Sequence, residues 1–281
     1  MNSTLNMLKY QEYTAWVSVG GQPLETYCVE TFPATNEVTC WIASEAGKEF
    51  SLHCRDTSAI RLHNLAVYMN IDGQNCGGVV LRNTAESYPN MNDTINMSDV
   101  PVSDTTVKQF VFSTVRLTDE DDFADTSSTG LGQIQLELRK VVLGNAILPR
   151  AYHFQTEHKV HERSKKAVTH CVGLGKEIVT TRPLFETRFT SQSIAKFTFK
   201  YRDPNLLKAN GVIQVPAPLK RKASQEIIDL TAHDVKGEGN RFNSLVRGER
   251  NSHSIKTGNK NKKVKQEQKA SSGLIEVIDL T

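Results

Sequence analysis

The sequence lacks the features that mark secreted, membrane-spanning and zinc-binding proteins. Its five cysteines are odd in number, scattered and never spaced as Cys-x-x-Cys, which argues against a disulfide framework or a structural zinc site. We therefore expect reduced, mostly buried thiols. No apolar run has the length of a signal peptide or a membrane-spanning helix, so we expect a soluble, intracellular protein with no membrane partner.

Motifs of the common catalytic classes are also missing. Gly-x-Ser-x-Gly does not occur. The acidic run at 119–122 lacks the glycine and the terminal glutamate of an EF-hand loop. Gly173-Leu174-Gly175-Lys176 lacks the spacing and the Ser/Thr of a phosphate-binding loop and predicts a turn. We expect no enzyme activity, no catalytic residue and no cofactor.

One cluster contains the residue types that bind metals. His158, His161 and Glu162 are followed by His170 and Cys171. The order His-x-x-His-Glu differs from His-Glu-x-x-His, in which the glutamate reaches a zinc-bound water. Lysines and arginines crowd the same segment and would repel a cation. The sequence therefore favours a solvated face on a short helix over 158–170, and no metal site.

Short apolar-alternating segments separated by turn residues occupy most of the first 215 residues. The clearest is 132–142, where Ile134, Leu136 and Leu138 alternate with polar residues. The segment 84–106 is rich in Asn, Ser, Asp and Pro and predicts a long loop. Strands are expected at 13–19, 24–32, 38–43, 49–54, 65–71, 78–82, 107–117, 132–142 and 197–202.

The predicted fold is an all-β, jelly-roll-like antiparallel β-sandwich with one or two short helices. Asp203-Pro204 supplies an N-cap and a first-turn proline for one helix, and Gly211 supplies its stop. We predict a lead-in at 1–12, the sandwich at 13–215 and a disordered basic tail at 216–281, because the tail has too little apolar area to offset chain entropy.

Seven short blocks are distributed along most of 10–213: Trp16–Val19, Thr39–Ile42, Ile71–Gly73, Phe110–Phe112, Leu131–Ile134, Glu162–Ala167 and Phe197–Arg202. In this order they resemble an uncharacterised, β-rich domain of unknown function that is abundant in mushroom-forming (basidiomycete) fungi. The resemblance implies a β-rich domain, often with a charged C-terminal tail, but no activity and no catalytic residues.

The tail is basic, although the whole chain has a net charge of only +3. Residues 220–270 contain thirteen Lys/Arg against six Asp/Glu, a net of +7, which leaves about −4 for the remainder. Two basic clusters fit nuclear-import signals that bind importin, the alternative being a solubilising linker. Nonspecific nucleic-acid contact is a compatible second role. The clusters consist of Lys220, Arg221 and Lys222, and of Lys262, Lys263 and Lys265.

Nearly the same hexapeptide occurs twice in this tail. Residues 226–231 read Glu-Ile-Ile-Asp-Leu-Thr, and residues 276–281 read Glu-Val-Ile-Asp-Leu-Thr. A β-branched segment that cannot build a core needs another surface, and it can add as a strand to the edge of a partner's sheet. The pattern resembles a SUMO-interacting motif. The expected SUMO-binding residues are Ile227, Ile228, Asp229 and Leu230 in the first copy, and Val277, Ile278, Asp279 and Leu280 in the second.

Two other interpretations of the hexapeptides stay open: an edge strand that docks on the chain's own domain, or a motif for another strand-binding partner. Lys236 and Lys265 each fit the aliphatic–Lys–any–Glu pattern at which SUMO is conjugated, and are candidate acceptors. Ser224 lies three residues after Arg221, which resembles a site for a basophilic kinase. A phosphate there would add negative charge just before Ile227.

Together these features predict a non-enzymatic nuclear interaction protein that binds SUMO or SUMOylated partners through 226–231 and 276–281. The alternatives are a chromatin or nucleic-acid binder that uses the basic tail, and an enzyme with an unrecognised site in the β domain.

Overall fold

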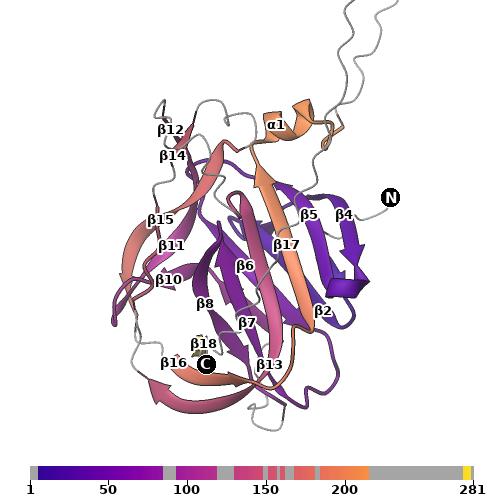
Figure 1. Ribbon diagram of the computed structural model, residues 1–281, viewed down its shortest axis with the longest axis vertical. Coiled ribbons are helices and arrows are strands. Elements are labelled where there is room, and N and C mark those ends of the chain that lie inside the picture. The colour runs from indigo at the N-terminus through magenta and orange to yellow at the C-terminus, as the bar shows by residue number, and fades with distance from the viewer. Residues whose placement is uncertain are drawn as a thin grey trace, which may run out of the picture. The chain divides into compact units, whose positions relative to one another are not determined.

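The computed structural model describes residues 6–84, 93–118, 130–147, 151–156, 159–161, 168–180, 184–214 and 275–279. The chain divides into two units, residues 1–215 with 273–281, and residues 216–272. The described residues all belong to the first unit, and they form β-strands with one short α-helix and a 3-10 turn at Pro33–Thr35 (Figure 1). The predicted all-β sandwich is confirmed.

The larger layer is an eight-stranded sheet in the order β16-β18-β8-β7-β13-β17-β5-β4. Its pairings are antiparallel except β17–β5 and β18–β8, which are parallel and depart from the predicted antiparallel arrangement. The strands are β4 (Thr26–Phe32), β5 (Glu37–Ala43), β7 (Asn64–Ile71), β8 (Gln74–Leu81), β13 (Gln133–Ile147), β16 (Leu184–Phe189), β17 (Ala195–Arg202) and β18 (Ile275–Asp279).

A second layer consists of two smaller sheets. One has the order β1-β2-β6-β9 with β3 beside β2, and the other has the order β10-β11-β15. A bridge between Glu49 and Val111 connects the two sheets. The strands are β1 (Leu8–Tyr10), β2 (Tyr13–Val19), β3 (Gln22–Pro23), β6 (Phe50–Asp56), β9 (Thr94–Met97), β10 (Asp99–Pro101), β11 (Thr106–Thr114) and β15 (His170–Val179).

The core lies between the two layers. Ile134, Leu136 and Leu138 of β13 are fully buried, as their period of two predicts. Aromatic rings connect the layers: Phe112 stacks on Phe50 at 4.2 Å between centroids and lies 5.3 Å from Tyr201. Stacked and tilted rings at these distances add to the stabilisation that burial of their area provides.

The helix and the buried thiols follow the sequence predictions. α1 (Pro204–Ala209) begins after Asp203, whose carboxylate accepts a hydrogen bond from the backbone N–H of Asn205 at 2.8 Å. Four cysteines are buried, and Cys28 is exposed. All five are free.

Several local predictions are wrong. The predicted loop at 84–106 contains β9 and β10, because Ile95 and Val100 are buried in the core. Where it is described, the predicted helix at 158–170 contains β14 (Lys159–His161), which pairs in parallel with β12 (Arg116–Thr118). The predicted turn at 173–176 lies inside β15, where the missing side chain of Gly173 lets β11 approach closely.

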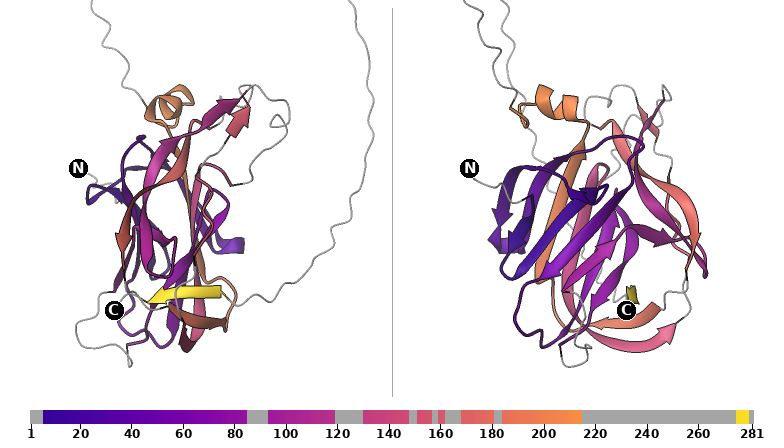
Figure 2. Two further views of the ribbon diagram at one scale, coloured as in Figure 1. Left: turned by 90° about the vertical axis from the view of Figure 1, so that its left-hand side faces the viewer. Right: turned by 180° about the vertical axis from the view of Figure 1, so that it is seen from behind.

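The predicted tail contains one described strand. Ile275–Asp279 forms β18, which is drawn in yellow in Figure 2. This strand pairs with β16 and with β8. The rest of the predicted tail lies outside the described residues.

Candidate functional site: the C-terminal strand and its slot

The structure describes only part of the second hexapeptide. Val277, Ile278 and Asp279 lie in β18, whereas Leu280 lies outside the described residues. The remaining tail predictions also lie outside them: the first hexapeptide with Ile227, Ile228, Asp229 and Leu230, the acceptor candidates Lys236 and Lys265, Ser224, and the basic residues Lys220, Arg221, Lys222, Lys262 and Lys263.

β18 pairs with a strand on each side. It runs antiparallel to β16 over four residue pairs, from Leu184↔Ile278 to Thr187↔Ile275. It runs parallel to β8 over two pairs, Ile278↔Val79 and Asp279↔Val80. We call the space between β8 and β16, which β18 fills, the strand slot. In this structure the described part of the second hexapeptide thus docks on the chain's own domain, which is one of the interpretations that the sequence leaves open.

One residue of β18 lies in register with both neighbouring strands. Ile278 is the residue that lies in register with both neighbours, Leu184 of β16 and Val79 of β8. Leu184 and Val79 are 1% and 3% exposed and belong to the main core. Ile278 is therefore paired in register with one residue of the main core on each side.

β16 is held in place by contacts independent of β18. It pairs with the second half of β13, between Val141↔Phe189 and Ile147↔Leu184. The hydroxyl groups of Thr187 and Tyr68 lie 3.0 Å apart and share a hydrogen bond, and burial raises the pKa of Tyr68 to about 12. One wall of the slot is therefore tied to the central strands.

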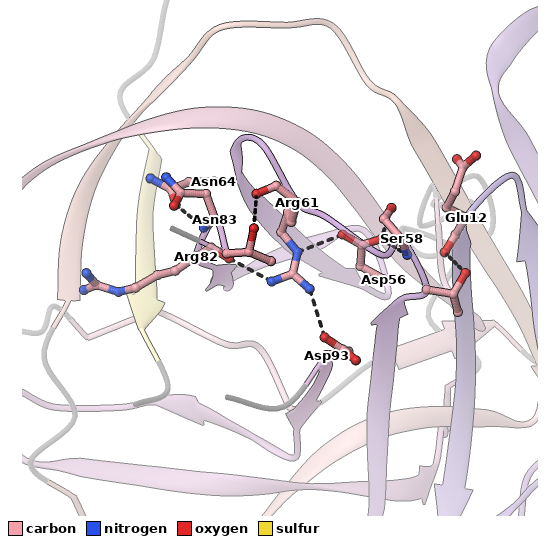
Figure 3. Close-up of polar contacts among 10 residues, drawn as sticks. Glu12, Asp56, Ser58, Arg61, Asn64, Arg82, Asn83 and Asp93 are labelled. Atoms are coloured by element: carbon pink, nitrogen blue, oxygen red, sulfur yellow. Dashed lines mark hydrogen bonds and ion pairs between the residues drawn. The ribbon is translucent and has the colours of Figure 1, made fainter. Parts of the chain in front are cut away.

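The end of β8, the other wall, is fixed by a buried cation. Arg61 donates to the Asp56 carboxylate at 2.7 Å and to the backbone carbonyl of Arg82 at 2.8 Å, and lies 3.5 Å from Asp93 (Figure 3). Arg61 and Asp56 are 7% and 1% exposed, so the pair is shielded from water. Removing one partner of such a pair leaves an uncompensated buried charge.

A groove of about 860 Å³ lies beside the slot. Its lining combines three basic residues, His63, Arg82 and Lys140, with exposed apolar side chains that include Leu62. The Arg82 guanidinium lies over the ring of Phe185 at 5.3 Å from its centroid. Phe185 lines the groove and is also the residue of β16 that pairs with Val277, so the groove lies next to the strand pair β16–β18.

One pair in the slot is electrostatically unfavourable. Glu186, which is exposed, lies directly opposite Glu276. Like charges directly opposite each other in a sheet are destabilising. The slot therefore supplies backbone pairing to β18, while the register sets two residues of like charge opposite each other at this position.

The described residues contain neither a metal-binding cluster nor a helix that could span a membrane. Within them, no three His, Cys, Asp or Glu side chains gather in a group that could hold a metal ion. Of the predicted cluster, His158 and Glu162 lie outside the described residues, while His170 and Cys171 belong to β15. No helix in the same part of the chain is long and apolar enough to cross a membrane.

The sequence predicts one wall of the slot in part and the other not at all. β16 was not predicted, although Leu184 and Thr187 of Leu-Phe-Glu-Thr-Arg-Phe are buried. The predicted 78–82 strand begins at Gln74 in the structure. The apolar run Gly77–Leu81 was the available signal that β8 is enclosed.

A family model described as a domain of unknown function (DUF7918) matches residues 12–216. No curated protein and no solved structure matches the chain.

Proposed function

The chain belongs to the DUF7918 family of domains of unknown function, and we propose from its own residues that it is a non-enzymatic nuclear interaction protein. It binds SUMO or SUMOylated partners through two tail strands, 226–231 and 276–281. From the family resemblance we also propose that the protein comes from a basidiomycete fungus.

One observation carries this proposal: Ile275–Asp279 pairs as a strand with β16 on one side and β8 on the other. Partner binding by β-augmentation requires that a segment take up an extended backbone and pair with sheet edges. Residues 276–279, the described part of the second hexapeptide, do this within their own chain. The first hexapeptide differs from it at one position, Ile227 in place of Val277, and both residues are β-branched.

The side-chain chemistry supports SUMO among strand-binding partners. Each copy places two β-branched residues and a leucine around one aspartate, with a glutamate just upstream. The aliphatic residues are the anchors for an apolar groove, and Glu226, Asp229, Glu276 and Asp279 face its basic rim. The two basic clusters of the tail fit import into the nucleus by importin.

A second candidate function is nucleic-acid contact through the basic tail. The net charge of +7 between residues 220 and 270 favours it. Such binding releases counterions from phosphate, so its affinity falls steeply with salt. A strand-mediated SUMO complex depends mainly on apolar anchors and backbone pairing, so its affinity changes less with salt.

The experiment compares the full chain with two triple variants. One replaces Ile227, Ile228 and Leu230 by Ala, and the matched control replaces Leu245, Val246 and Ile255, three aliphatic tail residues outside the hexapeptides. Binding to single SUMO, to a linear SUMO chain and to duplex DNA is measured at two salt concentrations.

We expect the hexapeptide variant to lose about tenfold or more on the SUMO chain and about twofold on single SUMO. Two motifs on one tail make the second contact with a SUMO chain intramolecular. The control variant retains both affinities. Equal losses in both variants, or binding to DNA alone, would reject the SUMO proposal.

A further inference from the structure

We infer that the strand slot between β8 and β16 is a peptide-binding site of the domain. Its ligand is an extended, acidic peptide that is rich in β-branched residues. Residues 275–279 occupy the site in the free protein and can be displaced from it. This inference goes beyond the proposed function, because it concerns what the domain itself binds and needs no SUMO.

The architecture of the slot supports a receptor role. β8 is paired with β7 on one side, and β16 is paired with β13, independently of the tail. Each wall thus has its own partner, and each presents its second edge to β18. Two facing edges can supply backbone hydrogen bonds to both sides of an inserted strand, which is the main source of affinity in strand addition.

The pairing of the resident strand favours exchange. β18 contributes two register pairs to β8 and four to β16, whereas β7 and β13 share eight. Glu276 opposite Glu186 weakens the docked state further. Docking is intramolecular, and this favours occupancy even when the strand itself binds weakly. We therefore expect β18 to occupy the slot in the free protein, and a competing peptide to be able to displace it.

The register also predicts which of the two hexapeptides the slot prefers. Ile275 lies opposite Thr187, which is 3% exposed. The residue that precedes the first hexapeptide is Gln225. A glutamine at this position supplies less apolar area and adds an amide that needs hydrogen-bond partners. The slot therefore prefers the second copy, so the second copy reaches an outside partner only while it is out of the slot, and the first copy does not compete with it for the slot.

The first test uses hydrogen exchange on the full chain without SUMO. Ile278→Asp introduces a charge at the register position between Leu184 and Val79, and Ile228→Asp makes the same change in the first copy. We expect exchange in 275–279 and along β16 to quicken at least tenfold in Ile278→Asp, and to stay unchanged in Ile228→Asp.

The second test supplies the ligand in trans. Labelled peptides of residues 273–281 and 223–231 are titrated into wild type, Ile278→Asp and Ile228→Asp. We expect the 273–281 peptide to bind Ile278→Asp at least tenfold more tightly than wild type, because the slot is vacated. The 223–231 peptide should bind Ile278→Asp about tenfold more weakly than the 273–281 peptide, since glutamine replaces isoleucine.

The inference is overturned if the 273–281 peptide binds all three chains alike or binds none of them. Unchanged exchange in β16 of Ile278→Asp would also reject it. If that variant fails to fold, Ile275→Gln replaces it, with a partial loss of protection in 275–279 as the expected result. Because SUMO is absent from both tests, failure of the SUMO proposal leaves their outcome unaffected.

Discussion

The hydroxyl group of Tyr201 donates to both carboxylate oxygens of Asp72, at 2.6 and 2.7 Å. The same carboxylate accepts the backbone N–H of Gly132 at 2.7 Å and that of Val172 at 2.7 Å. One side chain in the β7–β8 turn thus connects to β17, to the start of β13 and to β15. Asp72 and Tyr201 are 4% and 0% exposed, so these are charge-assisted hydrogen bonds in a dry environment.

We predict that Asp72→Asn lowers the free energy of unfolding by about 2–4 kcal/mol. Asparagine tolerates the positive φ of 54° at this position, so backbone strain stays small. Whichever way its amide group turns, its NH₂ replaces an oxygen that accepts a backbone N–H, either that of Gly132 or that of Val172. Urea unfolding followed by circular dichroism measures the change.

Tyr201→Phe removes one donor from the same network and should cost about 1.5–3 kcal/mol. The matched control is Tyr27→Phe, which removes a hydroxyl that donates to the exposed Glu25 at 2.8 Å. That control should change stability by less than about 0.5 kcal/mol. If both tyrosine variants lowered the free energy of unfolding by the same amount, the buried hydrogen bonds to Asp72 would add no more stability than an exposed one.

The five cysteines should differ sharply in reactivity. Burial raises the pKa of Cys40, Cys54, Cys76 and Cys171 to about 12, so these thiols carry almost no thiolate at neutral pH. Cys28 is exposed. We expect a thiol reagent at pH 8 to label one thiol in the native protein and all five in denaturant. Rapid native labelling of Cys28→Ser would contradict this assignment.

Local sequence patterns predicted the parts of the fold that local interactions determine. The alternation at Ile134, Leu136 and Leu138 identified β13, and Asp203-Pro204 identified α1, because both signals lie within one element. β14 and β15 were missed, because strand pairing with β12 and β11 outweighed the helical and turn propensities of their own residues.

The partners of Asp72 and the strand slot could not be predicted in the same way. The Asp-Gly turn is visible in the sequence, but its partners Gly132, Val172 and Tyr201 lie 60, 100 and 129 residues further along the chain. Likewise, the hexapeptide predicts a strand that needs an edge. Nothing in its own six residues says that β8 and β16 provide two.

Stability should decrease in mild acid through His170. Burial lowers the pKa of this histidine, against an opposing effect of Asp203, and its Nδ1 lies 2.8 Å from the Ser44 hydroxyl. The folded state therefore favours the neutral ring, while the unfolded chain takes up a proton near pH 6.5. The resulting stability is complete above about pH 6.5 and is lost as the pH falls toward the lower folded pKa.

We expect the midpoint of thermal unfolding to fall between pH 7 and pH 5, and His170→Asn to reduce this fall. The exposed His63 provides the control for the substitution itself, since His63→Asn makes the same change at a solvent-facing position. A steeper fall in His170→Asn would contradict the neutral-ring assignment.

Charge reversal in the slot should tighten the docking of β18. Glu186 lies opposite Glu276, so Glu186→Lys converts a repulsive cross-strand pair into an attractive one. Glu186 is exposed, and ion pairs that include an exposed group have small effects, so we expect hydrogen exchange in 275–279 to slow by about two- to fivefold at low salt. The gain should shrink as salt rises.

Glu30→Lys is the control, because it reverses an exposed charge on β4, at the other end of the same sheet. It should leave exchange in 275–279 unchanged. Adding Glu276→Lys to Glu186→Lys restores repulsion and should return the exchange toward wild type. If the rate of exchange in 275–279 does not depend on the sign of the charge at residue 186, β18 does not pair with β16 in this register.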